Sequence, residues 1–281
     1  MYYFLKSFSK LPLFFIQFLA KLAGDFLYMT NSSAKITSSK NLKIAYPKLN
    51  QNEHNTLLKS NLKHQCMTYV ESIKVWGSST DFALKQIKHV HRPEIFFNAL
   101  NNPKGTLAIV PHFGNWELMN AWINQHTSPV IMYKPSKNKD LDRFMLESRQ
   151  RLNATLVPTD DSGVRALFKH LKSGGFSAIL PDHVPKASGG IYSPFYGKKV
   201  LSPILLSKLA AKTECSIIGM YCLRNHDLDG FDLYFTDISK DIYSKDLQLS
   251  VDTLNHELEK MIDSYPEQYL WGYKRFRKSQ K

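Results

Sequence analysis

The chain has 281 residues, a length that one α/β domain with a short extension can fill. Hydrophobic residues make up 43% and charged residues 22%, which excludes a disordered chain, and three widely spaced cysteines exclude a disulfide framework or a C-x-x-C metal site. The 37 Lys and Arg outnumber the 24 Asp and Glu, giving a net charge of +13 that favours anionic partners; because no zinc-finger or RNA-binding signature occurs, we expect no nucleic-acid partner.

Residues 11–29 form an apolar, aromatic-rich stretch about as long as a membrane-spanning helix, but Gln17, Lys21 and Asp25 interrupt it. A cleaved signal peptide is not indicated, because no small-residue cleavage site follows. Lysines flank the stretch at Lys6, Lys10, Lys35, Lys40 and Lys43. This pattern suits a helix lying on an anionic membrane surface or a short anchor, and a buried first helix of the domain is the alternative. We expect residues 1–35 to form this membrane-associated segment and residues 36–281 to form the main domain.

The remaining pattern predicts an α/β fold. Residues 53–76 place apolar side chains on one helical face and end at Gly77. Short apolar runs typical of buried strands follow at residues 106–111, 129–134, 154–158, 176–181 and 216–221. Helical patterns alternate with them at residues 116–125, 139–151, 162–172 and 203–212, the last with Ser202 as its N-cap and Pro203 in its first turn. A strand at 231–236 and a helix at 249–263 complete a mostly parallel sheet flanked by helices.

His112 follows the predicted strand at 106–111 directly, in the sequence HFGNWE. Ligands of open α/β sheets bind at the carboxyl ends of strands, so this position favours chemistry. A turn containing Gly114 would bring the side chains of His112 and Glu117 together. The carboxylate would then fix the imidazole tautomer and leave the other ring nitrogen to act as a general base. Between them, Asn115 either caps the next helix or binds substrate.

Other polar residues follow neighbouring strands. Asp182 comes directly after the strand at 176–181, where a role in the site and a turn-capping role are both open. Arg149 and Arg165 lie on the two helices after the strand at 129–134. They would hold phosphates or an acidic partner, or else form a solvated helix face. A tetrahedral intermediate would need hydrogen-bond donors near the base, from the HFGN backbone or from a nearby Arg.

Several segments, in order along the chain, resemble the late lipid A biosynthesis acyltransferases. HFGNWE at 112–117 is similar to the H-x4-D/E motif of glycerolipid and lipid A acyltransferases. The other segments are KNLKIAYPKL at 40–49, VIMYKPSKNKDLDRFMLESRQR at 130–151, LPDHVPKASGGIYSPFYGKKVLSP at 180–203 and EQYLWGYKRFRK at 267–278. Lys134 stands where the family commonly has Arg, and His183 where it has Gln, so the bound lipid is the least specified part of the resemblance.

The resemblance implies an O-acyltransferase without a metal or other cofactor, at the cytoplasmic face of a bacterial inner membrane. His112 would be the base and Glu117 its partner, with Asn115, Lys134, Arg149, Arg165 and Asp182 as substrate-binding candidates. The donor would be a fatty acyl thioester on acyl carrier protein, or on CoA. The acceptor would be a hydroxyl of a lipid A precursor.

Four alternatives stay open at this point. A zinc hydrolase lacks an H-E-x-x-H cluster, and a serine hydrolase lacks a G-x-S-x-G elbow. A non-catalytic lipid-binding protein would explain the basic charge and the apolar amino terminus, but it leaves the His112 motif unexplained. An acyltransferase for an aminolipid, a glycolipid or a lysophospholipid would share the same fold. The sequence specifies neither the acyl chain length, nor the acylated hydroxyl, nor the oligomeric state.

Overall fold

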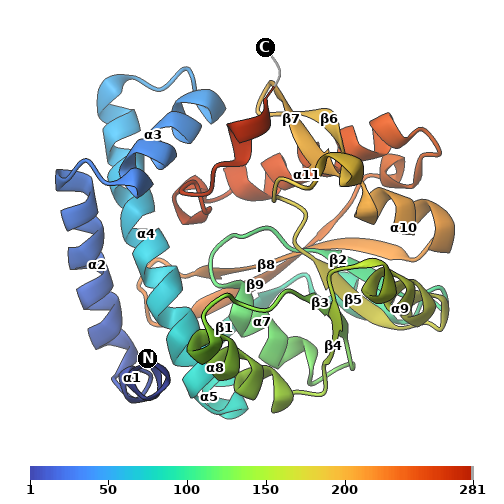
Figure 1. The fold of residues 1–281 in the computed structure, drawn as a ribbon, viewed down its shortest axis with the longest axis horizontal. Coiled ribbons are helices and arrows are strands. Elements are labelled where there is room, and N and C mark those ends of the chain that lie inside the picture. The colour runs from blue at the N-terminus through green and yellow to red at the C-terminus, as the bar shows by residue number, and fades with distance from the viewer. Residues whose placement is uncertain (280–281) are drawn as a thin grey trace.

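The computed structural model describes residues 1–279, and a seven-stranded sheet forms its centre (Figure 1). The strand order is β1-β9-β8-β2-β5-β3-β4, and every neighbouring pair is parallel except β8 and β9. The strands are β1 (Ile87–His91), β2 (Thr106–Ile109), β3 (Val130–Tyr133), β4 (Thr155–Pro158), β5 (Phe176–Ile179), β8 (Ser216–Arg224) and β9 (Phe231–Asp237). This confirms the predicted mostly parallel sheet flanked by helices.

Helices cover both faces of the sheet because its central strands are apolar on both sides. In β2, Leu107 and Ile109 point into one core and Ala108 into the other, as expected for the two-residue period of a strand. The first core includes side chains from α9 (Asp161–Lys172), α10 (Leu205–Thr213) and α11 (Leu247–Asp263). The second includes side chains from α5 (Thr80–Gln86), α6 (Pro93–Leu100) and α7 (Trp116–Ile123). A third, small cluster joins α1 (Tyr2–Phe8) to α8 (Lys139–Gln150).

The amino-terminal helices pack on the same domain. Helix α2 (Leu13–Met29) runs beside the long helix α4 (Gln51–Gly77), with α3 (Ser33–Ala45) between them in the chain (Figure 1). The buried face of α2 contains Ile16, Ala20 and Gly24. A Cβ atom on Gly24 would lie 2.6 Å from the Cα of Lys63, so a glycine permits this close approach. The expected boundary at residue 35 falls inside α3.

The amino terminus contains no straight apolar helix of spanning length. Among residues 1–279, no single helix is both long and apolar enough to cross a bilayer. Helices α1 and α2 taken together are long and apolar enough, but the angle between them is 112°. One face of α2 is buried against α4 while aromatic side chains cover the opposite face. The alternative of a buried first helix therefore holds for one face of α2, and the expected association with a membrane stays a prediction.

The region before α10 differs from the sequence prediction. Residues 190–203 form a β-hairpin of β6 (Gly190–Phe195) and β7 (Lys198–Pro203), in which Ser202 pairs with Ile191. Ser202 and Pro203 therefore end a strand, and α10 begins at Leu205 with Ile204 at the N-cap. The prediction was wrong there because a Ser-Pro pair also suits the end of a strand, and this strand forms by pairing with residues 190–195. The 3-10 helices are η1 (Ala187–Gly189), η2 (Lys240–Tyr243), η3 (Pro266–Gln268) and η4 (Arg275–Lys278).

Candidate active site

Residues 112–115 form a tight turn between β2 and α7, called here the 112–115 turn. Gly114 has a φ of 61°, and a Cβ atom at this position would lie 2.0 Å from the carbonyl oxygen of Cys222. Only glycine fits such a close approach at a positive φ without strain. All four amides of the turn donate hydrogen bonds, to Asp182 Oδ2, Pro111 O, Gln268 O and Cys222 O in chain order. The turn is therefore tied to the rest of the domain through its backbone.

The hydrogen-bond partner of the His112 ring is Asp182. The distance from His112 Nδ1 to Asp182 Oδ1 is 2.7 Å, and the backbone N–H of His112 donates to Asp182 Oδ2 at 2.9 Å. The two residues meet because β2 and β5 are neighbours, with Ile109 paired to Ile179, and each polar residue is the third one beyond its strand. Asp182 is 2% exposed. Both of its carboxylate oxygens bond to His112, and it is not among the residues that line the cavity described below; its expected role in substrate binding stays a prediction.

The charges of this pair stabilise each other. Burial disfavours the ionised Asp182, but His112 and its two hydrogen bonds outweigh that effect and lower the carboxyl pKa to about 2. Burial also disfavours the imidazolium of His112, yet the charge and hydrogen bond of Asp182, with a smaller contribution from Glu117, raise its pKa above the ordinary value. An ionised Asp182 thus holds the proton on Nδ1. Nε2 has no hydrogen-bond partner within residues 1–279.

Glu117 does not form the expected hydrogen bond with His112. Its carboxylate accepts hydrogen bonds from Trp76 Nε1 at 2.9 Å and from Arg149 Nη2 at 3.1 Å. The reason is geometric, because α7 begins at Trp116 and its first turn directs the Glu117 side chain towards α4 and α8. Glu117 still lies near enough to raise the pKa of His112. It is 6% exposed, so its ion pair with Arg149 is largely shielded from water.

His112 and Glu117 line one cavity of about 720 Å³. This size lies within the range of small-molecule sites, about 300–1,000 Å³. Most of its walls are apolar, with side chains from α4, α7, α8 and the strands β3, β4 and β5 that include Ile73, Met119, Ile123, Ile131, Met145, Leu156 and Ala178. The His112 ring packs edge-on against Trp116, with ring centroids 5.0 Å apart. The arrangement places one basic nitrogen beside a long apolar space.

The remaining predicted site residues are divided between this cavity and other places. Lys134 and Arg149 line the cavity. Arg165 is exposed on α9 and is absent from the cavity wall. Asn115 is completely buried and stands at the N-cap of α7, but its side chain makes no capping hydrogen bond and donates to Glu71 at 3.4 Å instead. The structure thus separates Asn115 and Arg165 from the cavity that they were expected to border.

Sequence reasoning missed three residues next to the site. Trp76 was assigned to the apolar face of a helix, although its indole N–H binds Glu117. Glu71 and Arg224 form an ion pair with side chains 1% and 0% exposed, below the 112–115 turn. In the sequence, Glu71 is a charged residue outside the predicted apolar face of the 53–76 helix, and Arg224 is a charged residue shortly after the predicted strand at 216–221. Such a signal does not identify the partner.

Comparison with known proteins adds a family assignment to this geometry. The family model described as bacterial lipid A biosynthesis acyltransferase matches residues 1–278. A lipid A biosynthesis palmitoleoyltransferase of Escherichia coli K12 is 23% identical over 260 residues, 91% of this chain and 81% of that protein. A lipid A biosynthesis acyltransferase of Haemophilus influenzae is 26% identical over 243 residues, 85% of this chain and 76% of its own. The E. coli K12 lauroyltransferase is 23% identical over 260 residues, 92% and 83% of the two chains.

Proposed function

The chain belongs to the bacterial lipid A biosynthesis acyltransferase family, and from that premise we propose that it moves a fatty acyl chain from acyl carrier protein to a hydroxyl group of a lipid A precursor. The observation that carries this proposal is the His112–Asp182 pair at the wall of the apolar cavity. An ionised Asp182 keeps the proton of the imidazole on Nδ1. Nε2 is then the lone-pair nitrogen that accepts a proton from the acceptor hydroxyl.

The reaction that fits these residues is direct acyl transfer. Nε2 of His112 takes the hydroxyl proton while the hydroxyl oxygen attacks the carbonyl carbon of the thioester. The tetrahedral intermediate then collapses, the carbon–sulfur bond breaks, and the thiolate leaves and takes the proton from the imidazolium. The amides of the 112–115 turn are already bonded to protein acceptors. Arg149, held against the cavity by Glu117, is therefore the donor that we assign to the oxyanion.

We expect Arg149→Lys to lower kcat by roughly 10²-fold, the usual effect of removing one oxyanion donor. Lysine keeps the charge, but its single ammonium cannot bind Glu117 and an oxyanion in the fixed geometry of a guanidinium. Steady-state kinetics with an acyl thioester of acyl carrier protein as the donor would measure this loss in kcat. The matched control is Arg143→Lys on the same helix, since Arg143 is 63% exposed. Equal activities of the two variants would remove Arg149 from the mechanism.

The apolar cavity accounts for the acyl chain of the donor. Burying an acyl chain stabilises the complex by about 0.8 kcal/mol per methylene group. The positive net charge of the protein would attract both an acidic carrier protein and the phosphates of a lipid A precursor. Lys134, which is exposed at the cavity wall, is the residue that we assign to an anionic group of either substrate.

We place the protein on the cytoplasmic face of the inner membrane through the outer faces of α1 and α2. Large apolar side chains are exposed there, namely Tyr3, Phe4, Phe14, Phe18, Leu22, Phe26 and Met29. Lys10, Lys40 and Lys43 on the adjoining segments are exposed as well and suit anionic headgroups. Because the opposite face of α2 packs on α4, this geometry favours a helix that lies in the membrane interface. Tyr69, which is 57% exposed, lines the cavity and lies on α4, the helix against which α2 packs.

Replacing Phe14, Phe18 and Phe26 together with Ser is expected to weaken binding to vesicles of phosphatidylethanolamine and phosphatidylglycerol by more than about 100-fold. Three exposed aromatic side chains contribute about 1.5–3 kcal/mol each when fully buried. Vesicle flotation would measure the loss. The melting temperature should stay unchanged, because these residues do not contribute to the core. Undiminished vesicle binding would show that the membrane contact lies elsewhere.

Transfer of labelled acyl chains tests the proposed function directly. Lauroyl, myristoyl, palmitoyl and palmitoleoyl groups would be offered on acyl carrier protein and on CoA. A lipid A precursor without secondary acyl chains would be compared with a lysophospholipid and a glycolipid as acceptors. Transfer to the lipid A precursor supports the proposal, and transfer only to another acceptor rejects its substrate. Folded protein that transfers no chain to any acceptor would reject the proposed activity.

A further inference from the structure

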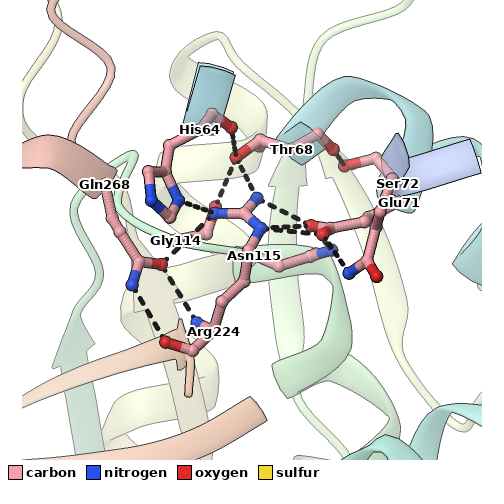
Figure 2. Close-up of polar contacts among 9 residues, drawn as sticks. His64, Thr68, Glu71, Ser72, Gly114, Asn115, Arg224 and Gln268 are labelled. Atoms are coloured by element: carbon pink, nitrogen blue, oxygen red, sulfur yellow. Dashed lines mark hydrogen bonds and ion pairs between the residues drawn. The ribbon is translucent and has the colours of Figure 1, made fainter. Parts of the chain in front are cut away.

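We infer that Glu71 and Arg224 are positioning residues, whose buried ion pair acts through Thr68 to hold the 112–115 turn and thereby aims His112 into the cavity. The inference rests on the proposed role of His112 as the base. Neither charged residue lines the cavity, so neither is a catalytic residue in the strict sense. Figure 2 shows Arg224 at the centre of the polar contacts and the turn residues Gly114 and Asn115 beside them.

The ion pair is bidentate and excluded from water. Arg224 Nη2 lies 2.6 Å from Glu71 Oε2, and Arg224 Nε lies 2.7 Å from Glu71 Oε1. Gln17 of α2 donates to the same carboxylate at 2.8 Å, and Nδ1 of the half-buried His64 lies 3.4 Å from Arg224 Nη1. Burial, followed by the charge of Arg224, lowers the pKa of His64 to about 3. The arginine is thus surrounded by acceptors, and among residues 1–279 Glu71 is its only salt-bridge partner.

Two contacts connect this pair to the turn. Thr68 accepts a hydrogen bond from Arg224 Nη2, and its own hydroxyl proton lies within reach of the carbonyls of His64 at 3.0 Å and Gly114 at 3.1 Å. The amide group of Asn115 donates to Glu71 Oε2 at 3.4 Å. Asn115 therefore contacts the ion pair directly, and Gly114 contacts it through Thr68 (Figure 2).

Gln268 closes the arrangement from the other side. Its side-chain oxygen accepts from the backbone N–H of Arg224 at 3.0 Å and from Nη1 at 3.2 Å, while its side-chain nitrogen donates to the Arg224 carbonyl at 3.0 Å. Its backbone carbonyl accepts from the N–H of Gly114 at 3.1 Å. Arg224 thus holds Gln268 in place, and the backbone carbonyl of Gln268 holds the 112–115 turn at Gly114.

A purely stabilising role explains this construction poorly. Apolar side chains of similar volume usually stabilise a core as well as a buried ion pair or better. Hydrogen bonds, unlike apolar contacts, fix direction, and the groups that receive them here belong to the turn that carries His112. A small displacement of a catalytic group lowers the rate of reaction without weakening substrate binding. The expected signature is therefore a loss in kcat with KM preserved.

Thr68→Val tests the link without removing a charge. Valine has nearly the same shape but no hydroxyl, so the Gly114 carbonyl and Arg224 each lose a partner. We expect kcat to fall by about tenfold, the value of one hydrogen bond, while KM changes by less than about twofold. Hydrogen exchange of the Gly114 and Asn115 amides should rise by about tenfold. Thr68→Ser, which keeps the hydroxyl, should restore both quantities to within about twofold of the wild type.

Further variants separate positioning from stability. Glu71→Gln should lower kcat more than Thr68→Val, and the two losses should not add, because both act on one turn. Leu258→Ala in α11, a buried position away from the cavity, serves as the control for lost stability and should keep kcat and turn exchange unchanged. The inference is overturned if Thr68→Val matches the wild type in both measurements, or if Leu258→Ala reproduces its effects. Hydrogen exchange needs no substrate, so failure of the proposed function would be recognised separately.

Discussion

The variant His112→Gln is expected to fold normally and to transfer acyl chains roughly 10⁴-fold more slowly than the wild type, at the upper end of the range for general acid–base catalysis. Glutamine has a similar length and keeps polar atoms next to Asp182, but it cannot take a proton from a hydroxyl. Because the loss lies in the chemical step, kcat should carry it and KM should change little. Transfer from acyl carrier protein, measured with single-turnover and steady-state kinetics, would separate these quantities.

The control for His112→Gln is His256→Gln. His256 lies on α11 with a side chain 64% exposed, so the same change should leave transfer within about twofold of the wild type. Circular dichroism and thermal unfolding would verify that both variants fold. If folded His112→Gln kept more than about a tenth of the wild-type rate, the base would have to be another group.

Asp182→Asn is expected to lower kcat by roughly 10³-fold and to change the pH dependence of the remaining activity. A neutral amide does not stabilise the imidazolium that forms in the transition state, and its NH₂ group can hold the wrong tautomer of the ring. In the wild type the pKa of His112 is raised above 6.5, chiefly by Asp182 against the opposing effect of burial. The base works only when deprotonated, so wild-type activity should rise with pH through this raised pKa.

Without the negative charge of Asp182, the pKa of His112 should fall and the acidic limb of kcat/KM should move to lower pH. Profiles of kcat/KM between about pH 5 and 9 would measure this shift, because they report the free enzyme. Glu117→Gln is the matched comparison, since Glu117 makes the smaller contribution to the His112 pKa and should shift the limb less. An acidic limb that stays in place in Asp182→Asn, or moves further in Glu117→Gln, would contradict the assignment of Asp182 as the partner of His112.

Local patterns in the sequence predicted most of the sheet and its covering helices. The strand predicted at 106–111 is β2, and the helix predicted at 53–76 is α4. Regions whose structure depends on a distant partner were missed. Strand β1 is an edge strand that forms only by pairing with β9, and the β6–β7 hairpin replaces the predicted start of a helix.

The candidate site divides in the same way. The sequence by itself determined that His112 follows a buried strand and that Gly114 permits a tight turn, because both follow from the order of neighbouring residues. Which strand lies next to β2 was decided only by the tertiary structure, and that neighbour, β5, supplies Asp182. Glu71 and Arg224 stand 153 positions apart, and only the fold brings them together beneath the turn. Chain order specifies local conformation, whereas a hydrogen bond depends on distances in space, so the partner of His112 was Asp182 and not the nearer Glu117.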